Sequence, residues 1–205
     1  MILTIPTIFL EKGKSKYSIT GLPEFSKLDS FFKENPFEIA KLFREENNKS
    51  ILFQCDNSTE SINIIKMVSS NLDIPIQVLI NSNIDPKLIN LLKDNSLIRV
   101  FASADLIKDY LNTIPIIKLS NINSISKTNL TRIMIDFEKK PIQPIQNFSN
   151  TKISVINAFS NTILLSKLNE IENNIDSIYL GNEYYGTHYA GQLLWRIAEK
   201  AQFSI

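Results

Sequence analysis

Two carboxylates stand where they could do acid–base chemistry. Asp56 ends the run LFQCD and Asp136 ends the run RIMID, so each follows directly on a short apolar stretch. A carboxylate at the end of a buried strand can exchange a proton with a ligand or contact it. The same residue at the same place can also cap the loop that follows. Both interpretations stand for Asp56 and Asp136, which are the candidate catalytic residues.

The single cysteine and the single histidine offer less. Cys55 has no histidine near it in sequence to activate its thiol, so we expect a buried, unreactive side chain. His188, in the segment YYGTHY, could act as a general base, but its aromatic neighbours indicate packing at a helix entry. One cysteine and one histidine exclude an internal disulfide and a histidine-rich metal site. Nucleotide-binding glycine motifs are absent as well, so neither a metal nor a cofactor is expected.

Charge and length narrow the class of protein. Lys+Arg number 22 and Asp+Glu 21, a formal charge of +1, which gives no electrostatic attraction to nucleic acid or to anionic lipid. The apolar runs are far shorter than the roughly 20 residues that span a membrane. We therefore expect a soluble cytoplasmic protein with no nucleic-acid and no membrane partner. A chain of 205 residues is expected to form one domain, 1–205.

Short β-branched runs alternate with helical patterns along the chain. The expected strands are 2–8, 50–54, 75–78, 98–101, 115–119, 132–136, 152–156 and 177–180. The expected helices are 36–46, 61–69, 86–92, 104–111, 163–171 and 190–201. Asn35 and Pro36 open the first of these helices as the N-cap and the first helical residue. Near-continuous apolar strands separated by helices are typical of a parallel α/β fold.

Eight strands predict a compact (βα)8, TIM-barrel-like fold. Such barrels usually need about 250 residues, with about 200 as the lower edge. The missing length falls between 119 and 152, where 124–130 could form only two turns and Pro141 and Pro144 interrupt any regular helix. We therefore expect helices 5 and 6 to be shortened or replaced by loop.

Several segments resemble the HisA/HisF family of histidine-biosynthesis barrels. The opening IPTIFLEKGK, 5–14, resembles the family pattern I-P-A-I-D-L-x-x-G-K, with Gly21 as the later glycine. Further similar segments follow in order: NPFEIAK at 35–41, LFQCD at 52–56, IPIQV at 74–78 and RVFASADL at 99–106. The resemblance covers most of the chain but leaves 111–152 without a clear match. It implies the barrel fold, an ancestral phosphoribosylformimino-aminoimidazole carboxamide ribotide isomerase-like activity and phosphate-binding loops.

The departures from the family pattern concern its catalytic acids. The aspartate that ends strand one in the isomerases is Phe9 here, and the aspartate after strand five aligns with Ser120. An aldose–ketose isomerisation needs proton transfer at two sites, and a phenyl ring transfers none. With these departures, the resemblance implies a barrel that has lost the isomerase reaction.

The phosphate loops of the family have changed too. Its G-G-G after strand three is Leu79-Ile80-Asn81, its G-T after strand four is Ala102-Ser103, and its S-G-G after strand seven is Asn157-Ala158-Phe159. Glycine lets the main chain approach a phosphate and adopt positive φ, so the larger side chains should weaken such sites. The ligand-binding positions that the resemblance still implies, for a phosphorylated small molecule, are Asn81, Ser82, Ser103, Asn157, Gly181 and Asn182.

Two apolar surfaces point to further roles. An amphipathic segment at 24–33 carries Phe25, Leu28, Phe31 and Phe32, which would plug the barrel mouth or bind a partner. Trp195 on the last expected helix would close the barrel or form an oligomer surface.

Three functions follow from these patterns. The first is a binding or interaction protein without isomerase activity. The alternative is an active histidine-biosynthesis aldose–ketose isomerase, an intramolecular oxidoreductase, in which Asp56 or Asp136 transfers the proton. The third is a subunit of a larger assembly, as a homo-oligomer or with another protein partner.

Overall fold

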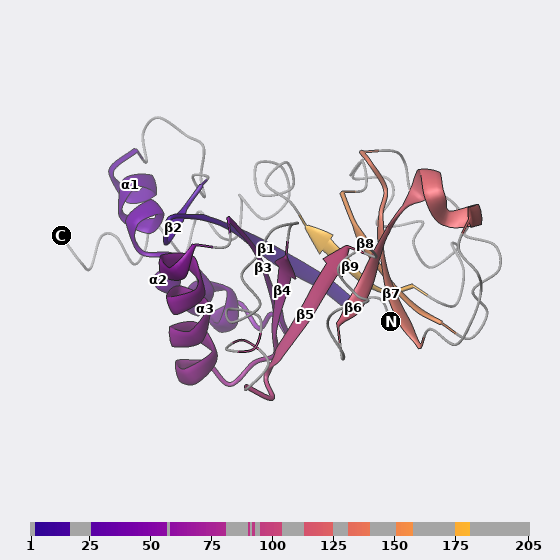
Figure 1. Ribbon diagram of the computed structural model, residues 1–205. Helices are drawn as coiled ribbons and strands as arrows, with labels where there is room; N and C mark the ends of the chain where they lie inside the picture. The colour runs from indigo at the N-terminus through magenta and orange to yellow at the C-terminus, as the bar shows by residue number, and fades with distance from the viewer. Residues whose placement is uncertain are drawn as a thin grey trace.

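One closed β-barrel dominates the structure (Figure 1). The computed structural model describes residues 3–16, 26–56, 58–80, 90, 92, 95–103, 113–124, 131–139, 151–157 and 175–180. The strands in these residues are β1 (Leu3–Glu11), β2 (Lys14–Ser15), β3 (Ile51–Cys55), β4 (Ile76–Ile80), β5 (Ile98–Ser103), β6 (Ile114–Lys118), β7 (Arg132–Asp136), β8 (Lys152–Ile156) and β9 (Ile175–Leu180). The helices are α1 (Ser26–Glu34), α2 (Pro36–Glu45), α3 (Thr59–Asn71) and the 3-10 helix η2 (Leu119–Ser124).

Eight of these strands run parallel and close on themselves. Each of β1 and β3–β9 pairs with the next, and β9 returns to β1 in the register Leu3–Ser177 to Pro6–Leu180. β2 adds a short antiparallel hairpin to β1. The predicted α/β barrel is thus confirmed at the level of a closed, all-parallel barrel with helices. Each expected strand is present, with ends shifted by up to a few residues.

The α-helices α1, α2 and α3 lie beside β2, β1 and β3, respectively, whereas η2 lies next to β6 (Figure 1). α2 and α3 confirm the helices expected at 36–46 and 61–69. The helices expected at 104–111, 163–171 and 190–201 lie outside the described residues, as does most of 86–92. After β6 the chain forms η2, and 125–130 and 140–150 are again outside the described residues. No helix in the described part of the chain is long and apolar enough to cross a membrane.

Asn35 corrects one expectation. It occupies the N-cap position of α2, with Pro36 next, but its side chain makes no capping hydrogen bond there. Instead, Asn35 Nδ2 donates to the carbonyl of Phe31 at 2.7 Å. The last carbonyls of α1 lack partners within their own helix, and α1 ends one residue before Asn35. Asn35 therefore satisfies the end of α1 rather than the start of α2.

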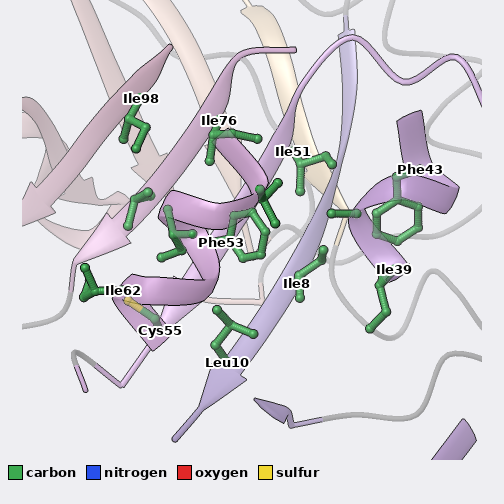
Figure 2. Packing of buried hydrophobic residues seen from close by; sticks show 14 of the residues in the cluster. Ile8, Leu10, Ile39, Phe43, Ile51, Phe53, Cys55, Ile62, Ile76 and Ile98 are labelled. Atoms are coloured by element: carbon green, nitrogen blue, oxygen red, sulfur yellow. The ribbon is translucent and has the colours of Figure 1, made fainter. Parts of the chain in front are cut away.

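Within the described residues, one cluster of apolar side chains lies on the outer face of the barrel wall and another lies on the inner face. The outer cluster fills the space between the strands and α1–α3, and Figure 2 shows Ile8, Phe53 and Cys55 within it. Cys55 is buried there, as predicted, and Gln54 beside it faces the other way because side chains alternate along a strand. Leu28 and Phe32 of α1 also contact the outer cluster. This face of α1 thus packs on the outside of the barrel wall. It does not fill the barrel mouth, contrary to the expectation from the sequence.

The inner cluster is arranged in layers of four side chains from alternate strands, as in (βα)8 barrels generally. Because the strands tilt relative to the barrel axis, residues paired in register on neighbouring strands differ in height along that axis by about one residue. Applied to the observed register, this places Leu52, Phe101, Met134 and Tyr179 in the middle layer. Below it lie Ile5, Gln77, Ile114 and Ser154, and above it Thr7, Leu79, Ile116 and Ile156. The barrel interior is a packed core, not a channel.

Candidate functional site

A polar layer closes the carboxyl end of the barrel interior. Gln54, Ser103 and Asp136 each stand two residues beyond a middle-layer residue of their strand, on the same inward face. All three are half-buried, whereas most of the side chains in the layers beneath are buried. Active sites of (βα)8 enzymes lie at this end of the barrel, so we call Gln54, Ser103 and Asp136 the mouth layer.

Asp136 is held in place through one of its two oxygens. Oδ1 accepts hydrogen bonds from the backbone N–H of Glu138 at 2.9 Å and from Asn157 Nδ2 at 3.1 Å. Among the residues that the structure describes, none donates to Oδ2. The carboxylate is therefore oriented and keeps an acceptor for a ligand. Asn157, expected to bind phosphate, uses its side-chain amide to position Asp136.

The turns around Asp136 adopt an unusual backbone conformation. Glu138, Lys139 and Asn157 have φ of 53°, 62° and 53°, the left-handed region that non-glycine residues enter at a cost of about 1–2 kcal/mol each. The turns are fixed by backbone hydrogen bonds, from Phe137 N to Ile156 O at 2.9 Å and from Lys139 N to Asn157 O at 2.8 Å. Strained backbone of this kind persists where the surroundings over-determine it, often at ligand sites.

Gln54 and Ser103 bring unused hydrogen-bonding groups to the mouth layer. Within the described part of the chain, neither the Gln54 amide nor the Ser103 hydroxyl has a hydrogen-bond partner. An amide offers two donors and an acceptor, and a hydroxyl offers both roles. Because the two residues are half-buried, a bound molecule could reach them. Ser103 was predicted from sequence, whereas Gln54 was missed; its place two residues after Leu52 is the signal that could have found it.

Phe9 lies at the rim above the mouth layer. It pairs in register with Gln54 and is half-buried. The sequence resemblance aligns Phe9 with the first catalytic aspartate of the isomerases and Ser120 with the second. Ser120 lies in η2, where its backbone N–H donates to Glu138 Oε2 at 3.1 Å. Lys118 pairs in register with Asp136 and is exposed.

Asp56 lies apart from the mouth layer and acts as a cap. Its Oδ2 accepts from the backbone N–H of Lys12 at 2.8 Å, and its Oδ1 accepts from Ser61 Oγ at 2.7 Å and Ser58 Oγ at 2.8 Å. Burial raises the pKa of Asp56, but the hydrogen bonds from Ser61, Lys12 and Ser58 outweigh it and hold the pKa below its ordinary value. The carboxylate therefore joins the β1–β2 turn to the start of α3, the capping arrangement that the sequence leaves open.

The structure does not bring the two candidate acids together. Asp56 follows β3 and Asp136 ends β7, and four strand-to-strand steps separate β3 from β7 in either direction around the barrel. The two residues thus lie on opposite sides of the barrel. A paired acid–base mechanism between them is not supported by this placement.

The remaining predicted residues have mixed outcomes. β4 continues through Ile80, so Leu79 packs inside the barrel and Ile80 against the helices. From the sequence we expected these side chains in the phosphate loop, but the unbroken run of apolar residues extends the strand instead.

Several predicted site residues lie outside the described residues, namely Asn81, Ser82, Gly181, Asn182, His188, Phe25 and Trp195. In the described ranges, no group of three or more His, Cys, Asp or Glu residues could hold a metal ion.

No protein-family model and no curated protein matches this chain. The resemblance to the HisA/HisF barrels therefore rests on sequence segments, namely 5–14, 35–41, 52–56, 74–78 and 99–106, with 154–161 and 178–186 at the expected places of the seventh and eighth strands. What the protein does has to be inferred from the mouth layer.

Proposed function

We propose that this chain is a divergent HisA/HisF-like barrel, compact and with its fifth and sixth helices shortened or replaced by loop, that binds a small molecule at the mouth layer without catalysing the isomerisation. The observation that carries the proposal is the pairing of Phe9 with Gln54 at the rim of the barrel. This puts a ring that cannot ionise where the isomerisation would need a general acid or base.

The second acid of the reaction has no replacement at its own position. The Ser120 backbone N–H is engaged with Glu138, and a serine hydroxyl has no acidity near neutral pH that could serve the reaction. Positioned acid or base groups contribute about 10²–10⁴-fold each. Losing both would leave turnover lower by several orders of magnitude.

The chain also lacks the G-G-G segment that follows strand three in the HisA/HisF family, and has Leu79-Ile80-Asn81 in its place. β4 holds extended backbone through Ile80, and Leu79 fills part of the interior layer directly beneath the mouth. Backbone N–H groups that pair within a sheet are not available to a phosphate. This supports a site that has exchanged two-phosphate recognition for contacts made by side chains.

Two assays on the purified protein test the proposal. The first is turnover of the family isomerase's substrate, for which we expect none above background. The second is thermal unfolding in the presence of phosphate, sulfate and phosphoribosyl compounds alongside uncharged and cationic metabolites. A ligand at one hundred times its Kd adds about 2.7 kcal/mol and raises the Tm measurably. Isomerase turnover by the wild-type chain would overturn the proposal.

One observation favours the alternative, an active isomerase with a relocated acid or base. Asp136 lies in the mouth layer and keeps Oδ2 as an acceptor, as a general base requires. Asp56 is the poorer base because its hydrogen bonds stabilise the ionised form and lower its pKa. In this alternative the chain complements a histidine auxotroph and Asp136→Asn abolishes growth, whereas Asp56→Asn does not.

The third candidate function, a subunit of a larger assembly, is favoured by an exposed aromatic side chain on α1. Phe31 of α1 is 50% exposed, while its neighbour Phe32 is buried against the outer cluster. Sedimentation of the purified chain distinguishes a homo-oligomer from a monomer.

A further inference from the structure

We propose that the mouth layer selects a ligand carrying a protonated amine beside a neutral hydrogen-bonding group, with Asp136 Oδ2 accepting from the amine and Gln54 and Ser103 contacting the neutral group. The inference rests on the proposed function, since it takes the mouth layer to be the ligand site. It goes beyond that function in assigning the chemical class of the ligand.

Charge is the first reason. In the mouth layer as described, Asp136 is the charged side chain, and Gln54 and Ser103 are neutral. The Glu138 carboxylate lies two residues from Asp136 in the same turn, and its Oε2 accepts from Ser120 N. An anionic group entering this layer would be repelled by the Asp136 carboxylate, whose Oδ2 is an acceptor and offers it no hydrogen bond. A cationic group entering this layer would be attracted by the Asp136 carboxylate and could donate a hydrogen bond to Oδ2.

The nearby lysines do not cancel the negative charge that Asp136 gives the mouth layer. Lys118 pairs in register with Asp136 and Lys139 follows in the next turn, but both side chains are exposed. No ion pair between Asp136 and either lysine occurs within the described residues. Exposed lysines remain hydrated and contribute little to a half-buried site.

Geometry is the second reason. Asp136 is oriented before any ligand arrives, because Glu138 N and Asn157 Nδ2 both bind Oδ1. The left-handed conformations of Glu138 and Asn157 are what place these two donors. A carboxylate fixed in this way loses little conformational entropy on binding. Its remaining oxygen is an acceptor only, so it suits a donor such as an ammonium group.

The surroundings define the rest of the ligand. Gln54 and Ser103 can donate to and accept from an amide or a hydroxyl, and neither has a partner among the described residues. Phe9 at the rim and Ile116 in the layer below are half-buried apolar side chains. They suit a hydrophobic portion of the ligand. Amino-acid amides, which join an ammonium, a neutral amide and an apolar side chain, represent this class.

The test uses leucinamide and phenylalaninamide as probes, with their N-acetyl derivatives and inorganic phosphate as comparisons. Binding to the full chain is followed by isothermal titration calorimetry and by the shift in Tm. We expect the two amides to bind the wild-type chain and the N-acetyl derivatives, which lack the charge, to bind at least tenfold more weakly. Phosphate should produce no shift.

Asp136→Asn is the decisive variant. Its carbonyl oxygen can accept both hydrogen bonds now made by Oδ1, which puts an amide nitrogen at the place of Oδ2. The hydrogen bonds that hold the turn are thereby preserved, but a donor replaces the acceptor Oδ2. The affinity for leucinamide and phenylalaninamide should therefore fall by tenfold or more. Ser103→Ala and Gln54→Leu, which leave Asp136 untouched, should each weaken binding several-fold. Glu60→Gln, an exposed carboxylate on α3, is the matched control for charge and should change nothing.

Two outcomes contradict the inference and can be told apart from failure of the proposed function. If phosphate or phosphoribosyl compounds stabilise the chain and the amides do not, the ligand class is wrong but a binding function stands. If the amides bind wild type and Asp136→Asn equally, the mouth layer is not their site. Isomerase turnover by the wild-type chain would instead remove the proposed function itself.

Discussion

At the scale of single residues, Asp56 shows how a candidate catalytic group can serve the fold. Its carboxylate accepts hydrogen bonds from Lys12 N, Ser58 N, Ser58 Oγ and Ser61 Oγ. These donors come from two segments, the β1–β2 turn and the start of α3. Asp56 thus connects the two segments, while Ser58 is the N-cap of α3.

Replacing Asp56 should therefore affect stability rather than ligand binding. We expect Asp56→Ala to lower the free energy of unfolding by about 1–3 kcal/mol at neutral pH, because the capping and charge-assisted hydrogen bonds are lost. Since the folded-state pKa of Asp56 is lowered, its contribution is present above the unfolded value of about 3.9 and disappears as pH falls through the folded pKa. Urea unfolding at several pH values checks this.

The control for that experiment is Asp73→Ala. Asp73 forms an exposed ion pair with Arg44, at 2.6 Å between Arg44 Nε and Asp73 Oδ1, which solvent screens. Its removal should cost less than removal of Asp56. Equal losses, or an Asp56→Ala variant as stable as wild type, would contradict the capping role.

Tyr179 is a buried ionisable group in the described part of the barrel interior. Its hydroxyl donates to Gln77 Oε1, Gln77 Nε2 donates to Ser50 Oγ at 3.0 Å, and Ser50 Oγ donates to the Pro75 carbonyl at 2.8 Å. The ring also contacts Phe101 edge to face, with centroids 6.0 Å apart. A chain of hydrogen bonds thus links β9 to the start of β4 through the apolar core.

Tyr179→Phe should lower the free energy of unfolding by about 1–3 kcal/mol, because Gln77 Oε1 then stays buried without its donor. The double variant Tyr179→Phe, Gln77→Met should lose less than the sum of the single variants, since both partners are gone. Chemical denaturation of all four proteins completes the cycle. Additive losses would show that the two side chains are not coupled.

The same residue predicts an alkaline effect. Burial raises the pKa of Tyr179 to about 12, while the nearby hydroxyls of Ser154 and Ser177 oppose the shift. A raised pKa gives stability that is present below the unfolded value of about 10 and is lost as pH rises through the folded pKa. Wild type should lose stability over that range, and Tyr179→Phe should lack this component.

At the scale of elements, the β1–β2 turn depends on close packing against α3. Lys12 and Gly13 have φ of 49° and 74°, and Gly13 N donates to Ser61 Oγ at 3.1 Å. A Cβ added at Gly13 would stand 2.9 Å from the Cβ of Glu60. This glycine is therefore required both by its backbone conformation and by the neighbouring helix.

Gly13→Ala should destabilise the chain by about 1–3 kcal/mol, the combined effect of a left-handed alanine and an overpacked contact. Lys12→Gly, one residue earlier, should be neutral or slightly stabilising because it relieves a non-glycine residue of the same conformation. The midpoints of urea unfolding compare the two. A Gly13→Ala variant no less stable than Lys12→Gly would refute this account of the turn.

At the scale of the whole molecule, the buried polar contacts of the barrel and the proposed ligand site lie at different heights. The lower half of the barrel holds the hydrogen-bonded chain of Tyr179 and the ion pair of Arg132 and Asp176 at 2.8 Å. Its carboxyl end holds the mouth layer and the strained turns after β7 and β8. Chemistry at the mouth therefore depends on several strands at once.

Under the proposed function, introducing one acid should not produce catalysis. We expect Phe9→Asp to remain inactive on the isomerase substrate, because Ser120 and the segment Leu79-Ile80-Asn81 also depart from the HisA/HisF pattern. Phe9 is half-buried, so the variant should fold, which its thermal unfolding checks. Substantial turnover by Phe9→Asp would sink the claim that the whole mouth has diverged.

The sequence alone predicted the elements of this barrel well. Its apolar runs located the eight parallel strands of the barrel but not the short β2, and helical periodicity located α2 and α3, because both patterns depend on neighbours within a few residues. The burial of Cys55 follows from the same alternation. Asn35 takes the expected N-cap position, but its side chain bonds to Phe31 and does not cap α2. The phosphate loop expected from Leu79 onward was wrong, because β4 continues through Ile80.

The tertiary structure decided which side chains share a layer. Gln54, Ser103 and Asp136 are far apart in sequence and meet only because the strands pair in one register and tilt by about one residue per strand. It also decided that Asp56 turns to the start of α3 while Asp136 stays at the mouth. Periodicity fixes the face on which a side chain lies, but only the pairing of distant strands fixes its height in the barrel and its partners there.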